Sequence, residues 1–337
     1  MNTKPTIAIV GATGVVGTEM IAVLEELNIP ISELRLLASE NSAGEQVKFK
    51  DQTCTIKTLN DEAFVGVDIA LFAVSSDLAE KYVPIAAESG ALVIDNSSHF
   101  RMDKEIPLIV PEVNGNQISE KNRIIANPNC STIQLVMILD KIRELSELKR
   151  VVVSTYQAVS GAGKEALDEL WNQTLAIFNQ KELQFEAFQH QIAFNCIPQI
   201  STFLDNGYTQ EETKVIQETR KILSLPNLRV TCTAVRVPVF NSHAESVNVE
   251  TEKPVDIQAL TKILDSAEGV KVYPNFEEYP MQLNTSSDNE VHVGRIRKDD
   301  SVENGLNLWI VADNLRKGAA LNAVQIADYC IKKYAQN

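Results

Sequence analysis

Cys130 has the sequence context of a nucleophile. It follows the turn Asn127-Pro128-Asn129 and precedes the apolar run IQLVMIL, so we predict that it lies in the first turn of a helix. The free N–H groups and the dipole of a helix N-terminus stabilise a thiolate there. The alternative is a buried, inert thiol, which is the usual state of a free cysteine. That second state is our prediction for the other four cysteines, Cys54, Cys196, Cys232 and Cys330.

His243 has the context of an acid–base group. It follows the alternating segment Arg229–Phe240 and stands in a polar Asn-Ser turn. Imidazole has the unperturbed pKa nearest to neutrality, which suits it to partner a cysteine. Taken alone, His243 would be interpreted as a loop histidine without a role. The other histidines, His99, His190 and His292, carry no further signal, and we predict that they are solvated or structural.

A glycine-rich turn near the start of the sequence has the form of a dinucleotide-binding motif. It reads G-x-x-G-x-x-G, and we predict that all of its residues contact a cofactor: Gly11, Ala12, Thr13, Gly14, Val15, Val16 and Gly17. The motif follows a predicted strand and opens a predicted helix, as the fingerprint requires. Glycine allows the backbone to approach a pyrophosphate, which the helix N-terminus attracts. The alternative is an ordinary strand–helix turn.

The end of the second predicted strand distinguishes the two nicotinamide cofactors. Ser39 stands where NAD enzymes usually carry an acid, and the small side chains of Ser39 and Ser42 leave room for a 2′-phosphate. No arginine is nearby, however, and Glu40 and Glu45 would repel a phosphate. We therefore favour NADP and leave NAD open.

Strand and helix patterns alternate along the first 130 residues, which predicts βαβ units and a mostly parallel sheet. The predicted strands are Thr6–Val10, Leu34–Ala38, Asp68–Val74, Ala91–Asp95, Leu108–Val110 and Arg123–Ala126. The predicted helices are Val15–Leu27 and Asp77–Glu88, and Val47–Lys50 with Thr53–Lys57 predicts a small hairpin.

The pattern changes near residue 150 to that of an α+β domain. Long strands are predicted at Arg150–Ala158, Arg229–Phe240, Ser246–Glu252, His292–Arg297 and Leu306–Ala312, the second and third pairing antiparallel. Helices are predicted at Lys164–Asn179 and Tyr208–Leu223. A last helix, Gly318–Tyr334, is predicted to pack on the first domain. We therefore predict an α/β protein whose Rossmann-like domain spans 1–128 and 316–337, with a second domain in 129–315.

Composition limits the class of protein. The chain has 337 residues, 31 Lys and Arg against 45 Asp and Glu, a net charge of −14 and 44% hydrophobic residues. These values are ordinary for a globular protein and argue against nucleic acid or an anionic membrane as the main partner. Five scattered cysteines argue against a disulfide framework and a structural zinc site, and we expect no metal. No segment has the pattern of a membrane helix or a signal peptide, so we expect a cytoplasmic protein.

Five motifs together resemble the aspartate-β-semialdehyde dehydrogenase family, in the branch common in Gram-positive bacteria. They are GATGVVG (Gly11–Gly17), NPNCST (Asn127–Thr132), STYQAVSGAG (Ser154–Gly163), RVPVFNSHAE (Arg236–Glu245) and GRIRKD (Gly294–Asp299). The resemblance covers about Thr6 to Ala327. It implies an NADP-binding Rossmann domain and a glyceraldehyde-3-phosphate dehydrogenase-like catalytic and dimerisation domain. It further implies a homodimer or homotetramer.

The activity implied by the resemblance is reduction of L-aspartyl-4-phosphate with NADPH to L-aspartate-4-semialdehyde, with release of phosphate. This step leads toward lysine, threonine, methionine and diaminopimelate. Cys130 would form a thioester, Gln157 would orient the reacting group, and His243 would be the acid–base group. The implied substrate-binding residues are Arg236 at the α-carboxylate, Glu211 at the ammonium group, and Lys214, Arg101 and Asn129 at the phosphate. Ser160, Gly161 and Asn322 are implied at the cofactor.

The residue types suit this substrate independently. Arginine binds a planar carboxylate through two hydrogen bonds, and lysine binds phosphate as a point charge. Glu211 and Lys214 are three positions apart and would share a helix face. The alternative for that pair is a solvated surface ion pair, worth well under about 1 kcal/mol.

Three other functions fit parts of the pattern. Another acyl-phosphate reductase, such as N-acetyl-γ-glutamyl-phosphate reductase, shares the chemistry but typically has Pro-Gly-Cys-Tyr at the nucleophile. A catalytically inactive relative is conceivable, although Cys130, Gln157, Arg236 and His243 are all present. A nucleotide-binding redox sensor with Cys130 as its switch would bind the cofactor without turnover.

Overall fold

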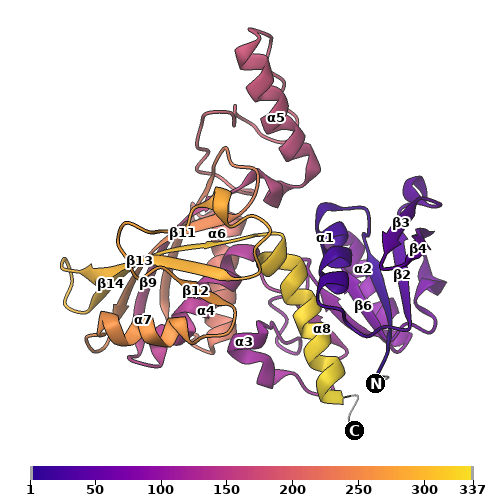
Figure 1. Ribbon diagram of the computed structural model, residues 1–337, viewed down its shortest axis with the longest axis horizontal. Coiled ribbons are helices and arrows are strands. Elements are labelled where there is room, and N and C mark those ends of the chain that lie inside the picture. The colour runs from indigo at the N-terminus through magenta and orange to yellow at the C-terminus, as the bar shows by residue number, and fades with distance from the viewer. Residues whose placement is uncertain (1–2, 335–337) are drawn as a thin grey trace. The chain divides into compact units, whose positions relative to one another are not determined.

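The computed structural model describes residues 3–334, which fold into two units (Figure 1). Unit 1 contains the residues up to Asn129 together with those from Ala319 onward, and unit 2 is Cys130–Gly318. The chain therefore leaves unit 1, builds all of unit 2, and returns to complete unit 1 with its last helix.

Unit 1 is built on a parallel sheet with the strand order β5-β2-β1-β6-β7-β8. The bounds are β1 Thr6–Val10, β2 Glu33–Ala38, β5 Lys57–Thr58, β6 Ile69–Phe72, β7 Leu92–Asp95 and β8 Ile124–Ala126, and a hairpin is formed by β3 Gln46–Phe49 and β4 Gln52–Thr55. The chain adds β2 on one side of β1 and β6 on the other. The order thus reverses at β1, where doubly wound sheets bind ligands beyond the carboxyl ends of their strands.

Helices cover both faces of this sheet, which explains why β6 is apolar throughout, β1 is apolar after Thr6, and β7 is apolar up to Asp95. They are α1 Val15–Glu26, α2 Ser76–Glu88, the short α3 Pro111–Asn114 and α8 Leu321–Tyr334. Alternate residues of β1 face opposite layers: Ile7 and Ile9 pack with α1 and α8, whereas Ala8 and Val10 pack with α2.

Unit 2 is built on a mixed sheet with the order β10-β9-β11-β14-β13-β12. Its strands are β9 Leu148–Gln157, β10 Arg229–Arg236, β11 His243–Thr251, β12 Val270–Val272, β13 Val291–Asp299 and β14 Gly305–Ala312. Its helices are α4 Cys130–Arg143, α5 Lys164–Phe178, α6 Gln210–Leu223 and α7 Ile257–Asp265. Neither the helix Ile257–Asp265 nor the strand Val270–Val272 was predicted from the sequence.

Two predictions about strands are wrong. The segments Arg229–Phe240 and Ser246–Glu252 do not pair with each other, because β9 lies between them and β10 runs parallel to β9. The long connection through α5 and α6 brings the chain back to the starting end of β9, which makes a parallel strand possible. Leu108–Val110 forms only a single bridge, Leu108 to Ala126, because Pro111 follows and opens α3.

No helix within residues 3–334 combines the length and the apolarity that a membrane span requires.

Candidate functional site

Three polar side chains meet where neighbouring strands of unit 2 end or begin. In the strand registers Arg236 of β10 lies beside Gln157 of β9, and Gln157 lies opposite His243 of β11. Residues opposite each other in a sheet point to the same face. All three are buried, with exposed fractions of 5%, 2% and 0%. The topology therefore produces a row of guanidinium, amide and imidazole from positions up to 86 residues apart in the chain, 157 to 243.

Cys130 is the first residue of α4, as predicted. Its charge acts on Arg236, so the thiol lies within electrostatic reach of the polar row. The backbone of Gly318 lies directly against it, because a Cβ on Gly318 would come 2.9 Å from the Cβ of Cys130. A thiol at the start of a helix that covers the row can act on a group bound there.

His243 is held in one tautomer by the backbone. The N–H of Ala158 donates to Nδ1 at 3.1 Å, so the neutral ring carries its proton on Nε2. Burial, followed by the charge of Arg236, lowers the pKa of His243 to about 3. Nε2 has no hydrogen-bond partner within residues 3–334, and it faces Gly161, where a Cβ would come within 3.1 Å. The ring thus presents an N–H donor to the space beside Gly161.

Glu211 and Gln157 complete the charge pattern. The Gln157 amide donates to Oε1 of Glu211 at 3.2 Å and accepts from the hydroxyl of Thr155 at 3.1 Å. Lys214 lies 3.6 Å from Glu211, the predicted pairing along one helix face. Glu211 is buried, so this pair is not the solvated surface ion pair of the alternative interpretation.

The capping box of α6 explains why Glu211 is held in place. Thr209 and Glu212 exchange side-chain and backbone hydrogen bonds at the first turn. The second oxygen of Glu212 accepts from the N–H of Ala234 on β10. The first turn of α6 is thereby fixed to the strand that carries Arg236.

The negative charges of Glu211 and Cys130 favour the charged form of the Arg236 guanidinium. Burial lowers its pKa, and the negative charges of Glu211 and Cys130 raise it. Its Nη1 donates to the carbonyl of Ala158 at 2.6 Å. The remaining donors of the guanidinium fork can bind one planar anion through two parallel hydrogen bonds.

The glycine turn of unit 1 fits a dinucleotide. A Cβ on Gly17 would come 2.1 Å from the carbonyl oxygen of Gly11, and one on Gly11 would come 2.3 Å from that of Ala73. Gly11 also has a φ of +87°, in the left-handed region. Gly14 caps α1 without a side-chain hydrogen bond, which leaves N–H groups for an anion. This cradle of backbone supports the motif as a cofactor site, as opposed to an ordinary turn.

Four of the remaining residues implied at the cofactor or phosphate follow the carboxyl ends of unit 1 strands: Ser39 and Ser42 after β2, Arg101 after β7, and Asn129 after β8. Ser39 and Ser42 flank a short 3₁₀ turn after β2. Arg101 donates to the carbonyl of Asn96 at 2.7 Å. Asn322 donates to the carbonyl of Ile109 and to Asn127. Asn129 is the last residue of the first part of unit 1, and Ser160 and Gly161 belong to unit 2.

Sequence reasoning missed Asn314. This buried amide accepts from the backbone of Ser242 at 2.9 Å and shares hydrogen bonds with the hydroxyl of Ser160. It therefore joins the residue before His243 to the residue before Gly161. The available signal was the pair Asp313-Asn314 directly after an apolar strand, where polar residues at a strand end commonly serve a site.

The other four cysteines differ in burial. Cys232 and Cys330 are buried; burial raises the pKa of Cys232, and raises that of Cys330 to about 12. They fit the inert thiol of the prediction. Cys54 is half-buried in the hairpin. Cys196 is exposed in a loop, so the prediction of a buried thiol is wrong there.

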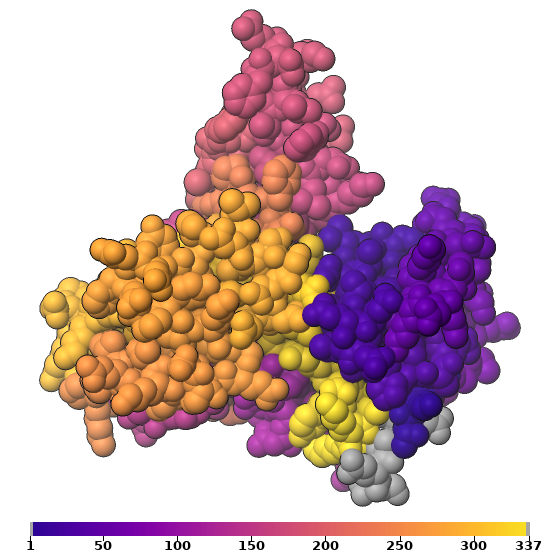
Figure 2. All heavy atoms as spheres, in the orientation of Figure 1, coloured from indigo at the N-terminus to yellow at the C-terminus, as the bar shows by residue number. Residues whose placement is uncertain are grey.

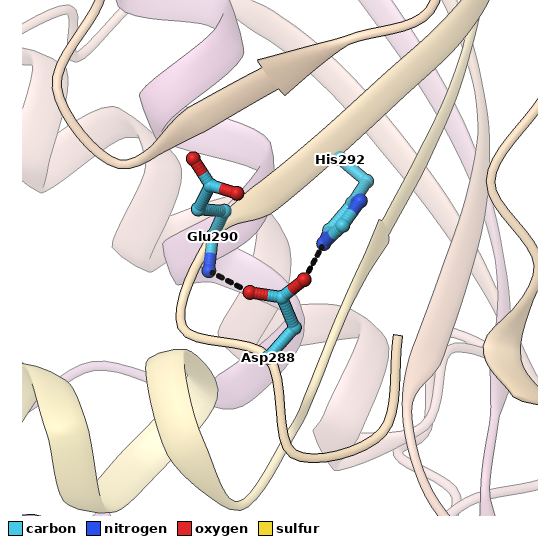
Figure 3. A group of neighbouring side chains, drawn as sticks. All are labelled: Asp288, Glu290 and His292. Atoms are coloured by element: carbon cyan, nitrogen blue, oxygen red, sulfur yellow. Dashed lines mark hydrogen bonds and ion pairs between the residues drawn. The ribbon is translucent and has the colours of Figure 1, made fainter. Parts of the chain in front are cut away.

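A separate group of titratable side chains is formed by Asp288, Glu290 and His292 (Figure 3). Nε2 of His292 lies 3.1 Å from a carboxylate oxygen of Asp288, and Nδ1 lies 3.1 Å from the hydroxyl of Tyr273. The other oxygen of Asp288 accepts backbone N–H groups of Asn289 and Glu290. His292 therefore contacts Tyr273 through one ring nitrogen and Asp288 through the other, which agrees with the prediction that it is structural.

Two family models match the chain. Residues 6–121 match "Semialdehyde dehydrogenase, NAD binding domain", and residues 139–317 match "Semialdehyde dehydrogenase, dimerisation domain". Unit 1 is thus a nicotinamide-dinucleotide-binding domain, and unit 2 is the dimerisation domain of this family.

Similar proteins carry a consistent name. The aspartate-semialdehyde dehydrogenase of Aquifex aeolicus is 51% identical over 333 residues, covering 97% of this chain and 98% of that protein. That of Bacillus subtilis is 49% identical over 332 residues, covering 96% of each. The crystal structure of aspartate semialdehyde dehydrogenase II from Vibrio cholerae, complexed with ASA, has a TM-score of 0.96 and 47% identity, covering 98% of this chain and 99% of that chain.

Proposed function

The chain belongs to the aspartate-semialdehyde dehydrogenase family, and from this we propose how its residues carry out the reaction. The reaction is the nicotinamide-dependent conversion of L-aspartyl-4-phosphate to L-aspartate-4-semialdehyde and phosphate. The assignment of roles rests on one observation. Arg236, Gln157 and His243 form a row beneath the start of α4. The comparisons support this activity and give no support to the alternative reductase or to a redox sensor.

The charges of the row match the amino-acid end of the substrate. Arg236 binds the α-carboxylate through its free donors, and Glu211 binds the α-ammonium group. Gln157 already donates to Glu211 and so fixes its direction. Lys214 binds the phosphate as a point charge, and the family resemblance implies the same role for Arg101 and Asn129. Support for the first two roles comes from their burial, because a buried charge pair gains most from a ligand of opposite charges.

Cys130 acts as the nucleophile. Its thiolate attacks the acyl carbon, the carbon–oxygen bond to the phosphate breaks, and the phosphate leaves with the bonding electrons. The product is a thioester on Cys130. The start of α4 supports this role, because free N–H groups there favour the thiolate over the thiol. The absence of a side chain at Gly318 leaves the Cys130 backbone room to hold this position.

His243 acts as a hydrogen-bond donor to the acyl oxygen. When bound, the nicotinamide cofactor supplies the hydride that reduces the thioester carbon. The acyl oxygen gains negative charge in that step, and the N–H on Nε2 stabilises it, since Nδ1 is engaged by Ala158. The sulfur–carbon bond then breaks, which releases the aldehyde and returns the thiolate. In this direction the predicted acid–base role of His243 reduces to hydrogen-bond donation by a neutral ring.

The cofactor is held by the glycine turn of unit 1, and we propose NADP. The exposed Ser39 and the half-buried Ser42, which follow β2, have small side chains that leave space for the 2′-phosphate. The family resemblance implies Ser160 and Gly161 at the nicotinamide, and within unit 2 Gly161 lies against His243 and Arg236. Asn322 contributes by holding strand ends, because its N–H groups bond to Ile109 and Asn127.

Unit 2 forms a homodimer through the sheet face that α4 and α6 leave uncovered. Tyr156 and Trp309 pack together on that face, with ring centroids 5.4 Å apart, and Ser246 between their strands is exposed. Figure 2 shows α5 and the segment after it standing out from the rest of unit 2. This arm exposes Trp171, Phe178 and Phe194, which are 56%, 74% and 65% accessible. Large exposed aromatics support a protein contact.

The five free thiols support the proposed cytoplasmic location.

The assay that tests this function follows reduced nicotinamide during incubation with L-aspartate semialdehyde, phosphate, and NADP or NAD. The wild-type chain should reduce NADP faster than NAD. Cys130→Ala should lose turnover by at least about 10⁴-fold, as expected for a lost nucleophile. The exposed Cys196→Ala is the matched control and should keep wild-type turnover. Turnover by Cys130→Ala would remove Cys130 from the mechanism.

A further inference from the structure

A second pair of buried polar side chains, Glu245 and Gln134, lies next to the proposed catalytic row of Arg236, Gln157 and His243. Glu245 follows His243 by two residues on β11, so both side chains point to the same face of the sheet. Gln134 follows Cys130 by four residues on α4, so both lie on the same face of the helix. Glu245 is 0% exposed and Gln134 is 1% exposed.

The two side chains depend on each other for hydrogen bonding. The Gln134 amide is the hydrogen-bonding group next to the Glu245 carboxyl. Neither carboxyl oxygen of Glu245, and neither polar atom of the Gln134 amide, has a partner at hydrogen-bonding length in the described part of the chain. A buried polar group without a partner costs about 1–3 kcal/mol. Two such groups side by side therefore gain most by bonding to each other.

The protonation state decides which pairing is possible. Burial raises the pKa of Glu245 well above its ordinary value. A protonated carboxyl has one O–H donor and one carbonyl acceptor, and the amide has N–H donors and one carbonyl acceptor. The two groups therefore match in two reciprocal hydrogen bonds. An ionised carboxylate would accept from the amide N–H but would leave an oxygen charge facing the amide oxygen.

Within the described residues 3–334, no cation contributes to the pKa of Glu245 in a way that would keep it ionised. The neighbours in the strand registers are Thr155 of β9 and Ile310 of β14, which are uncharged. Cys232 of β10 is the titratable side chain of a neighbouring element on which the charge of Glu245 acts. On its own strand the nearest titratable group is His243, and burial keeps that ring neutral.

We propose that Glu245 and Gln134 form a reciprocal acid–amide pair that fixes the first turns of α4 on β11, and that Glu245 thereby positions Cys130 relative to His243. The pair joins α4 to β11 next to Cys130 and His243, the residues proposed to react. This role rests on the proposed catalytic pair, and Glu245 itself touches neither substrate nor cofactor.

The test compares Glu245→Gln and Glu245→Leu in the complete enzyme. Glutamine has the size of the protonated acid and forms the same two hydrogen bonds with Gln134, whereas leucine forms none. Steady-state kcat and KM, thermal unfolding, and the pH dependence of Cys130 alkylation by iodoacetamide are measured, the last by mass spectrometry of the peptide that contains Cys130. Gln134→Leu tests the same link from the helix if Glu245→Leu does not fold.

Glu245→Gln should keep kcat within threefold and leave the pH midpoint of Cys130 alkylation unchanged. Glu245→Leu, or Gln134→Leu, should lower kcat at least tenfold while KM stays within threefold. A Cys130 midpoint shifted to lower pH in Glu245→Gln would show that an ionised carboxylate was removed, and would overturn the pair. A leucine variant that unfolds at lower temperature but keeps kcat would also overturn it, because the role would then be structural alone. Failure of the proposed function is distinguishable, since the wild type itself would not reduce NADP.

Discussion

At the scale of single residues, the proposed substrate site contains an arginine that is buried beside a glutamate. Arg236 is 5% exposed and Glu211 is 6% exposed, and the negative charge of Glu211 opposes the effect of burial on the arginine. A buried pair of this kind costs desolvation that a ligand of opposite charges repays in part. The geometry of the guanidinium is therefore as important as its charge.

Arg236→Lys should keep the charge and lose the two-pronged contact. We expect KM for L-aspartate semialdehyde to rise about 10- to 100-fold, equivalent to about 1.4–2.7 kcal/mol, with kcat within about threefold. Steady-state kinetics at saturating phosphate and NADP measures this. An unchanged KM would place the α-carboxylate elsewhere.

His243 should make the stability of the protein depend on pH. Its pKa is about 3 in the folded protein, against an ordinary 6.5. Below pH 6.5 the imidazole of His243 is therefore protonated in the unfolded chain but neutral in the folded protein. The free energy of unfolding consequently falls as the pH falls. His243→Asn removes this group while its side-chain oxygen can still accept from Ala158. Between pH 7 and pH 5 the wild type should lose about 2 kcal/mol more unfolding free energy than His243→Asn, measured by urea unfolding. Parallel losses would show that His243 ionises freely.

What sequence can predict at this scale depends on the distance over which the signal acts. The helix start at Cys130 is predictable because the turn before it and the apolar run after it are local. Asn314 is not, because its partners Ser160 and Ser242 are 154 and 72 residues away. The tautomer of His243 is likewise set by Ala158, 85 residues earlier.

At the scale of elements, the glycine turn separates folding from binding within one motif. Gly17 packs against the backbone of its own turn, because a Cβ would come 2.1 Å from the Gly11 carbonyl oxygen. Gly14 is less constrained: a Cβ there would lie 3.4 Å from the same oxygen, and its φ of −74° suits any residue. Gly17 therefore serves the fold, whereas Gly14 leaves room for the proposed cofactor.

Gly17→Ala and Gly14→Ala form a matched pair. Gly17→Ala should lower stability by about 3 kcal/mol, the cost of overpacking against backbone. Gly14→Ala should cost about 1 kcal/mol, the usual loss for alanine at a helix cap, but should weaken NADP binding at least tenfold. Thermal unfolding and titration calorimetry measure the two effects. Equal NADP affinity in Gly14→Ala and the wild type would move the pyrophosphate away from this turn.

The elements themselves were predictable where their patterns are local, and their pairing was not. The strand at Arg229–Arg236 is evident from alternation, but its partner depends on the path of the chain through α5 and α6. That path passes residues 158–228, and no short-range pattern records the end of β9 to which it returns. Antiparallel pairing of two segments close in sequence is the simpler expectation, and it fails because β9 occupies the place between them.

At the scale of the whole molecule, the uncovered sheet face of unit 2 should govern association. Ser246 is exposed on that face and lies in register with Trp309 and Ser154. Ser246→Arg should convert the proposed dimer to a monomer, because it would bring two like charges into the centre of the proposed two-fold contact. Size-exclusion chromatography with light scattering measures the mass. Ser266→Arg, on the exposed end of α7, is the control and should leave the mass unchanged. A dimer that survives Ser246→Arg would place the contact on another face.

The return of the chain to unit 1 has a consequence for the order of events during synthesis. Unit 2 is one continuous segment, so it can fold as soon as Gly318 has left the ribosome. Unit 1 has to wait, because Leu321, Val324, Ile326 and Ile331 of α8 fill the layer beneath β1 and α1. The nucleotide domain, although translated first, is therefore the last to mature. Until α8 emerges, its open apolar layer is the part of the nascent chain most exposed to chaperones and proteases.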